Sequence, residues 1–228
     1  AHGLHDHIVH FYHLSALDWV DVATLPQASP AGAAKIGQTL SNWPGNSKEE
    51  MTRILDTMKG FLSRGQLGIF REGYWGHPAM RLPPDVNLLA VAHYLQALDA
   101  QRKANQIVGI LGSKTPHIQN TAVGGVMNAI NPDGFGAMNV DRLYRLKGLF
   151  DEVIPFVHDV YFNDVCAIAA NYMDWFDYGA GHKNFLCVPD LPTDAAATAF
   201  DLPGGTIFDG DLGTLRGIDN WKDGPFRK

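Results

Sequence analysis

The sequence predicts a mainly α-helical fold with a small irregular β region near its C-terminal end. Apolar residues recur at intervals of three and four in several segments before residue 171, which is the spacing of a buried helix face. After that point two short β-like runs occur, at 185–188 and 206–209, and prolines and glycines separate them. Hydrophobic residues fill 46% of the 228 positions, and we expect residues 1–228 to form a single domain with its own core.

The first predicted helix runs from about His2 to Thr24 and ends before Pro26. Its polar stripe consists of His2, Asp6, His10 and His13, and its apolar face of Leu4, Ile8, Phe11, Trp19 and Val22. Asp6 can contact His2 and His10, because residues four apart on a helix are neighbours. A helix with one polar stripe is typical of a buried position, and a buried carboxylate needs histidine or arginine partners.

The next elements follow from local signals. A loop is expected from Gly32 to Pro44. Ser47 and Glu50 form a capping box, which predicts a helix that Gly65 ends. The segment from Gly68 to Pro84 is rich in glycine and proline and is expected to be packed but irregular.

A third helix is expected to begin after Asp85 and to end at Gly112. Residues 112–138 form a long glycine-rich connection, and loops of this length are usually functional or lie at an interface. Asn139 can cap a fourth helix, which Pro155 should bend, and further helix is expected over 160–171.

Charged residues are scarce, at 18% of the chain compared with about 25% in ordinary soluble domains. This scarcity predicts that a partner chain, or other parts of the same protein, covers much of the surface. The net charge of −6 and the lack of a basic tract argue against nucleic acid as a partner. No apolar run reaches the length of a membrane span. The chain begins inside a helical pattern, so we interpret it as an internal piece of a longer polypeptide.

Five of the ten histidines fall within the first 13 residues. Histidine is the side chain that most readily moves protons and binds metals near neutral pH. The types and spacing of His2, Asp6, His10 and His13 suit an autonomous zinc or copper site, and the alternative is a cluster of hydrogen-bonded structural histidines. The sequence has no Walker A motif, no Gly-x-Gly-x-x-Gly cradle, no His-Glu-x-x-His and no Gly-x-Ser-x-Gly elbow.

The histidine-rich start and several later segments resemble, in order and over essentially the whole chain, the large subunits of nickel-iron hydrogenases. The likeness is greatest to the membrane-associated or periplasmic uptake group of that family. The segments that carry the resemblance are His5–Val22, Ser41–Pro44, Gly65–Arg71, Gly73–Pro78, Leu82–Pro84, Ala92–Asp99, Gly112–His117, Gly124–Asn131 and Leu202–Gly205.

The resemblance implies the central part of the large-subunit fold and a centre of nickel and iron, with cyanide and carbon monoxide ligands. In the family four thiolates hold the two metals, and they come from one CxxC motif near each end of the mature subunit. This sequence contains neither motif, so no metal ligand is expected within it. Cys166 and Cys187 match no ligand position, and we expect both to be buried structural residues.

Two residues of this chain carry roles that the resemblance implies. Asp6 matches an aspartate above the metals, which holds an arginine from outside this chain over the site where hydrogen is split; the alternative is an ion pair that only positions the first helix. His117 matches a histidine near the proximal iron-sulfur cluster of the small subunit, and its alternative is an ordinary interface contact. The other histidines at the start are then expected to support or pack around the site.

The implied activity is the oxidation of H2 to protons and electrons, with the electrons passed to a small iron-sulfur subunit. A membrane cytochrome b, reached through that small subunit, is a further candidate partner. The implied location is the periplasm or cell envelope, with membrane association through the partner subunits. Two alternatives remain open: a stand-alone metal-binding protein that uses the His/Asp stripe, and a non-catalytic scaffold homologue that has lost its metal centre.

Overall fold

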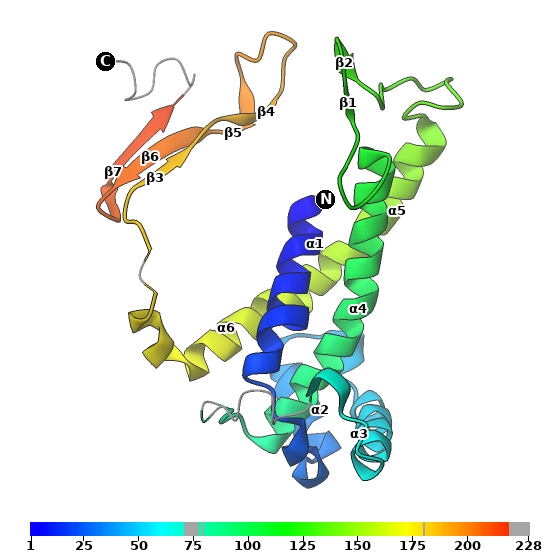
Figure 1. Cartoon of the computed structure of the whole chain (residues 1–228), viewed down its shortest axis with the longest axis vertical. Helices are drawn as coiled ribbons and strands as arrows, with labels where there is room; N and C mark the ends of the chain where they lie inside the picture. Colours follow the sequence, from blue (N-terminus) through cyan, green and yellow to red (C-terminus); the bar gives the residue numbers. More distant parts are fainter. Residues whose placement is uncertain (71–77, 79, 180, 219–228) are drawn as a thin grey trace. The chain divides into compact units, whose positions relative to one another are not determined.

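The computed structural model describes residues 1–70, 78, 80–179 and 181–218 (Figure 1). The chain divides into two compact units, Ala1–Asn171 and Tyr172–Lys228, and each is described by itself. The first unit is helical apart from a short hairpin, and the second carries short antiparallel strands. The expected class, mainly α with a small β region, is therefore confirmed. The expectation of a single domain stays a prediction.

The segment expected to be one helix from His2 to Thr24 is broken into pieces, and that expectation was wrong beyond Asp18. Near Asp21 the backbone becomes extended, and the Asp21 carboxylate accepts a hydrogen bond from the amide of Ala23 at 2.9 Å. This local bond offers the chain an alternative to the helix ladder and starts a 3₁₀ segment. The pieces are the α-helix α1 (His2–Ile8), the π-helix η1 (Val9–Leu14), and the 3₁₀ segments η2 (Ser15–Asp18) and η3 (Val22–Gln27).

Residues expected to lie in a loop instead form the helix α2 (Pro30–Leu40). Ser29 caps this helix by accepting a hydrogen bond from the amide of Gly32 at 3.2 Å, with a proline in the first turn. The expectation was wrong because the buried face consists of Ala33, Ala34 and Gly37, which give no bulky apolar periodicity. A short 3₁₀ turn, η4 (Pro44–Asn46), follows.

Two helices lie where the sequence predicts them. In α3 (Lys48–Ser63) the hydroxyl of Ser47 accepts a hydrogen bond from the amide of Glu50 at 3.2 Å. The long helix α4 (Pro84–Gly112) packs against α1, α2, α3 and α5, and its residues 87–94 are all buried. Between them lies the 3₁₀ turn η5 (Gly68–Phe70). Residues 71–77 and 79 of the expected irregular segment lie outside the described residues.

The long glycine-rich connection after α4 is confirmed. It contains a short hairpin, β1 (Thr121–Ala122) paired with β2 (Gly125–Val126), and most of its side chains are exposed. Asn139 then caps α5 (Val140–Phe156) by accepting a hydrogen bond from the amide of Arg142 at 3.0 Å, as expected. The helix changes type after Pro155, whose missing N–H interrupts the ladder. It continues as the π-helix η7 (Val157–Tyr161) and then as α6 (Phe162–Asn171).

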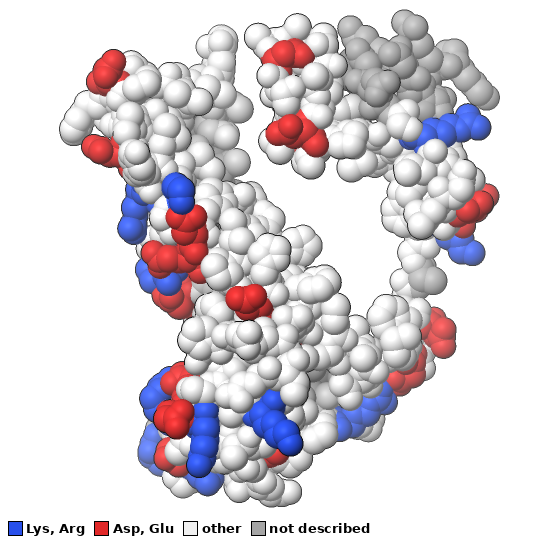
Figure 2. Space-filling view, turned by 180° about the vertical axis from the view of Figure 1, so that it is seen from behind, with Lys and Arg blue, Asp and Glu red and all other residues white. Residues whose placement is uncertain are grey.

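The composite helix Val140–Asn171 is long and apolar enough to cross a membrane by length and composition alone. The expectation from the sequence that no segment is long and apolar enough to cross a membrane was wrong, although core helices of soluble proteins can also be this long and apolar. Much of the visible face in Figure 2 carries no Lys, Arg, Asp or Glu. The exposed apolar side chains of the composite helix are Val140, Leu143, Tyr144, Ile154 and Phe162.

The second unit carries both β-like runs that the sequence predicts. The first run is β3 (Phe185–Cys187), and the second falls in β6 (Gly204–Phe208), which pairs with both β3 and β7 (Asp211–Ile218). Asp209 and Gly210 join β6 to β7 with φ angles of 56° and 69°, which suits the Asp-Gly turns of two-residue hairpins. A second pair consists of β4 (Asp190–Pro192) and β5 (Phe200–Leu202), and a 3₁₀ turn, η8 (Met173–Asp177), precedes the strands.

Candidate functional site

Asp6 lies on α1 with 63% of its side chain exposed, so the expected burial of this carboxylate was wrong. Its partner is His5, whose Nδ1 lies 2.9 Å from Asp6 Oδ1, and not His2 or His10. The hydrogen bond from His5, together with the nearby histidines, holds the pKa of Asp6 below its usual range. Asp6 is therefore ionised near neutral pH, and its other oxygen makes no hydrogen bond with the described residues.

The histidine stripe does not converge on a metal site. His2 and His10 are exposed, whereas the ring of His13 packs edge-on against Tyr94 of α4 with 4.8 Å between ring centroids. Burial lowers the pKa of His13, so this side chain packs as a neutral ring. Across the described part of the chain, no group of three or more His, Cys, Asp or Glu side chains could hold a metal ion. The autonomous site built from His2, Asp6, His10 and His13 is therefore not formed.

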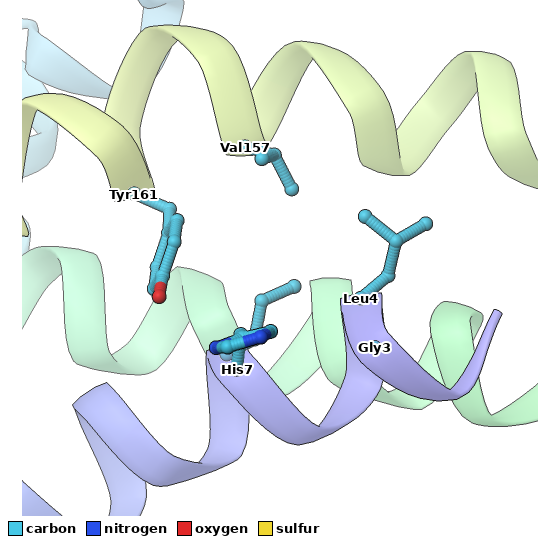
Figure 3. Close-up of a pocket in the computed structure, with 6 residues that line it drawn as sticks. Gly3, Leu4, His7, Val157 and Tyr161 are labelled. Atoms are coloured by element: carbon cyan, nitrogen blue, oxygen red, sulfur yellow. The ribbon is translucent and has the colours of Figure 1, made fainter. Parts of the chain in front are cut away.

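A cavity of about 280 Å³ lies beside α1, between this helix and η7 (Figure 3). Its wall is almost entirely apolar, and the polar side chains on it are His7 and Tyr161. Burial raises the pKa of Tyr161, so its hydroxyl stays protonated near neutral pH. The lining residues are Gly3, Leu4, His7, Ile8, Val157 and Tyr161.

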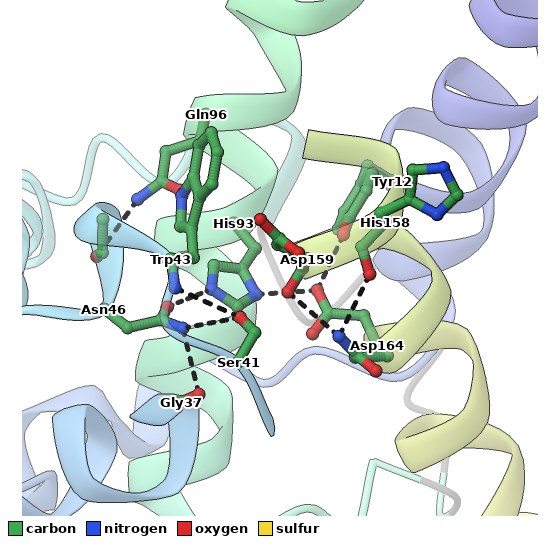
Figure 4. Close-up of polar contacts among 12 residues, drawn as sticks. Tyr12, Gly37, Ser41, Trp43, Asn46, His93, Gln96, His158, Asp159 and Asp164 are labelled. Atoms are coloured by element: carbon green, nitrogen blue, oxygen red, sulfur yellow. Dashed lines mark hydrogen bonds and ion pairs between the residues drawn. The ribbon is translucent and has the colours of Figure 1, made fainter. Parts of the chain in front are cut away.

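Four buried polar side chains form a hydrogen-bonded chain through the interior of the first unit (Figure 4). The hydroxyl of Tyr12 donates to Asp164 Oδ2 at 2.7 Å, and His93 Nδ1 lies 2.7 Å from the same oxygen. On the other side of the ring, His93 Nε2 lies 2.7 Å from Asn46 Oδ1. Burial and the Asp164 charge hold the pKa of Tyr12 well above its usual range. This chain of side chains, Tyr12–Asp164–His93–Asn46, is called the buried relay below.

The buried relay joins four separate elements. Tyr12 belongs to η1, Asp164 to α6, His93 to α4 and Asn46 to η4. The amide of Asn46 also donates from Nδ2 to the carbonyl of Gly37 at 3.0 Å. A β-carbon at position 37 would lie 2.8 Å from the Asn46 amide carbon, so glycine is what allows α2 to approach so closely.

Sequence reasoning missed the buried relay, although two signals were available. His93 interrupts the continuously apolar run of α4, and Asp164 lies within the apolar α6. Each isolated polar residue needs a buried partner. The partners are 71 positions apart in the chain, so the spacing within one helix could not pair them.

His117 lies in the connection after α4, is exposed, and has a φ angle of 60°. Histidine is among the non-glycine residues that tolerate this left-handed region. Its ring makes no hydrogen bond with the described residues. The backbone before it is held by Asn128, whose Nδ2 donates to the carbonyl of Leu111 at 2.9 Å and to Ser113 Oγ at 3.0 Å. No contact joins His117 to Asp6 within the described residues.

Cys166 and Cys187 are both exposed in this chain, so the expectation that they are buried was wrong. On α6 the buried face contains Asp164, and a residue two positions further along a helix points away from that face. On β3 every side chain is exposed. The two cysteines lie in different units, and neither belongs to a group that could bind metal in the described residues.

Comparison with known proteins gives a consistent result over nearly the whole chain. A family model described as "Nickel-dependent hydrogenase" matches residues 1–224. The Hydrogenase-2 large chain of Escherichia coli is 53% identical over 223 residues, which cover 98% of this chain and 39% of that protein. The uptake hydrogenase large subunit of Bradyrhizobium diazoefficiens is 44% identical over 225 residues, covering 95% of this chain and 37% of that protein.

A solved structure shares the fold. The Ni-Fe-Se hydrogenase from Desulfovibrio vulgaris Hildenborough matches with a TM-score of 0.58 at 25% identity, over 94% of this chain and 34% of that one. The chain therefore spans less than two fifths of the length of the relatives it matches. The histidine-rich start, the connection with His117 and the buried relay all fall within the residues that the family model matches.

Proposed function

Because this chain belongs to the nickel-dependent hydrogenase family, we propose that the complete protein is the catalytic large subunit of an uptake hydrogenase. In this proposal it oxidises H2 to protons and electrons and passes the electrons to a small iron-sulfur subunit. The observation that carries the proposal is the unbroken family match over residues 1–224. The relative from Bradyrhizobium diazoefficiens, which is named as an uptake hydrogenase large subunit, supports the uptake direction.

The described residues of this chain do not supply a coordination shell for a nickel-iron pair. They contain no cluster of three potential ligands, and the two cysteines belong to different units. The resemblance assigns the four thiolates to CxxC motifs, and this sequence contains no such motif. The metal pair, with its cyanide and carbon monoxide ligands, would supply hydrogen activation. The residues of this chain would act around it.

Asp6 is the residue of this chain that we propose to act at the reaction centre. An ionised, exposed carboxylate with one free oxygen can accept a hydrogen bond from a guanidinium group at close range. In the proposal Asp6 holds an arginine from the rest of the large subunit over the metals, where its positive charge stabilises developing negative charge. His5 fixes one oxygen of Asp6 and leaves the other for that arginine.

His117 supports the proposed path for electrons. It lies in an exposed connection whose backbone is fixed by Asn128, and its ring is free to meet a partner subunit. We place the proximal iron-sulfur cluster of the small subunit near it, where a hydrogen bond can tune the potential of the cluster. A periplasmic or cell-envelope location, with a membrane cytochrome b reached through the small subunit, completes the proposal.

The direct test uses the complete enzyme with Asp6→Asn, which keeps the size of the side chain and removes its charge. We expect full nickel content and a fall in H2 oxidation of about a hundredfold or more, as for the loss of one electrostatic contact in other active sites. Asp56→Asn is the matched control, because Asp56 is an exposed aspartate of α3 and lies outside the proposed site.

Two results would count against the proposal. A nickel-loaded Asp6→Asn enzyme that turns over at the parent rate would exclude the role of Asp6. A complete protein that contains no nickel would instead favour the non-catalytic scaffold, and it would be recognised by elemental analysis before any kinetic measurement.

A further inference from the structure

The geometry of the buried relay fixes which atom of Asn46 faces His93. Asn46 Nδ2 donates to the carbonyl of Gly37, which can only accept, so Asn46 Oδ1 is the atom that faces His93. Since Oδ1 also can only accept, His93 Nε2 carries a hydrogen. On the other side of the ring, His93 Nδ1 lies 2.7 Å from Asp164 Oδ2, the oxygen that also accepts from the hydroxyl of Tyr12. The His93–Asp164 pair is thus held by Asn46 at one end and by Tyr12 at the other.

This arrangement holds one side of the N-terminal helical segment firmly. Ile8 and Tyr12 are each only 1% exposed, whereas Asp6 lies on the opposite, exposed side of the same segment. Tyr12 is the residue of this segment that donates to Asp164 of the buried relay, and it does so from within the π-helix η1. π-helical segments inside helices are frequent at functional sites.

We propose that Tyr12 is a positioning residue for Asp6. Its hydrogen bond to the His93–Asp164 pair sets the rotation of the α1–η1 segment about its own axis, and that rotation sets where the Asp6 carboxylate points. Asn46 holds the His93 ring of the buried relay from the other side. This inference rests on the proposed function, because it assumes that Asp6 acts at the reaction centre.

A small rotation is enough to matter. A carboxylate about 6 Å from a helix axis moves by about 1 Å when the helix turns by about 10°. A misplacement of about 1 Å at a reacting centre can cost up to about a hundredfold in rate. Loss of a single anchoring hydrogen bond should release part of this rotation, so we expect Tyr12→Phe to lower kcat about tenfold.

The experiment is a double-mutant cycle in the complete enzyme. Parent, Tyr12→Phe, Asp6→Asn and the double variant are compared for nickel content, for kcat and KM with H2, and for hydrogen–deuterium exchange of the peptides covering residues 1–14. Tyr161→Phe is the matched control: it also loses a phenol hydroxyl next to Tyr12, at 6.2 Å between ring centroids, but this hydroxyl makes no hydrogen bond with the described residues.

If Tyr12 acts through Asp6, Tyr12→Phe lowers kcat with little change in KM and speeds exchange in the peptides of 1–14. The double variant is then no slower than Asp6→Asn alone, because a misplaced carboxylate cannot be lost twice. A role in general stability gives a different result, in which the two effects multiply.

Three results overturn the inference: multiplied effects in the double variant, a Tyr12→Phe enzyme no slower than Tyr161→Phe, and loss of nickel from Tyr12→Phe. The proposed function fails separately if Asp6→Asn alone retains the parent rate with full nickel, and the inference fails with it. If Asp6→Asn is slow and Tyr12→Phe is not, only the inference fails.

Discussion

Replacing His93 with leucine should leave the Asp164 carboxylate buried without its histidine partner. The side chains of His93 and Asp164 are 2% and 10% exposed, so little solvent is available to screen the stranded charge. Removing one member of such a buried pair costs about 3–5 kcal/mol. The free energy of unfolding should fall by that amount, and the thermal unfolding midpoint should fall with it.

The measurement is the thermal unfolding midpoint of the complete large subunit, compared with two further variants. Replacing both His93 and Asp164 with leucine removes the charge together with its partner, and this double variant should be more stable than His93→Leu alone. His13→Leu is the control for removing a half-buried ring: His13 faces the carbonyl of Tyr94 at 3.4 Å and no carboxylate, so its loss should cost about 1 kcal/mol.

The reasoning is refuted if the double leucine variant is less stable than His93→Leu by the full cost of Asp164→Leu. Such additivity would mean that the two residues stabilise the fold independently and form no coupled pair. Equal losses for His13→Leu and His93→Leu would refute it as well, because they would show that ring packing, and not the stranded charge, sets the cost.

Two further predictions concern Tyr12 and His117. Because the pKa of Tyr12 is raised in the folded state, the stabilisation that its hydroxyl provides is complete below about pH 10 and is lost as the pH rises toward the folded-state pKa. The thermal unfolding midpoint should therefore fall more steeply between about pH 9 and 11 in the parent than in Tyr12→Phe. His117→Ala should slow H2 oxidation when the electron acceptor is reduced through the small subunit. It should leave H2/D⁺ isotope exchange unchanged, because that exchange needs no electron to leave the large subunit. An equal loss of both activities would place His117 elsewhere in the mechanism.

The sequence predicts best the features that a few neighbouring residues decide. Ser47 and Asn139 each begin a helix as expected, because an N-cap needs only a side-chain oxygen and the amide three residues later. The helix α2 was not predicted, because its buried face consists of alanine and glycine and shows no periodic pattern of large apolar residues. The helix break near Asp21 was not predicted, because the hydrogen bond from the Asp21 carboxylate to the backbone outweighs the helical pattern on both sides of it.

The sequence proposes site residues but does not predict their contacts. Asp6 was selected from the sequence, yet its partner is the adjacent His5 and its side chain faces outward, which only the packing of α1 decides. The buried relay depends on Asp164 meeting His93 from 71 positions away. Such a pairing exists only after helices α4 and α6 have been brought together, so no local spacing rule contains it.

The polar groups of this chain therefore fall into two classes that differ in how completely they are satisfied. Inside the described residues every buried side-chain nitrogen and oxygen has a hydrogen-bond partner, and the buried relay pairs His93 with Asp164. By contrast, Asp6 and His117 lie on the surface, the first with one oxygen free and the second with no hydrogen bond to the described residues. Polar groups whose hydrogen bonds are all made in the interior stabilise a fold, whereas surface groups with unused hydrogen-bonding capacity are available to bind further protein. For this reason the buried relay is better suited to position a site than to take part in the reaction. Asp6 and His117 are better suited to contact the rest of the enzyme.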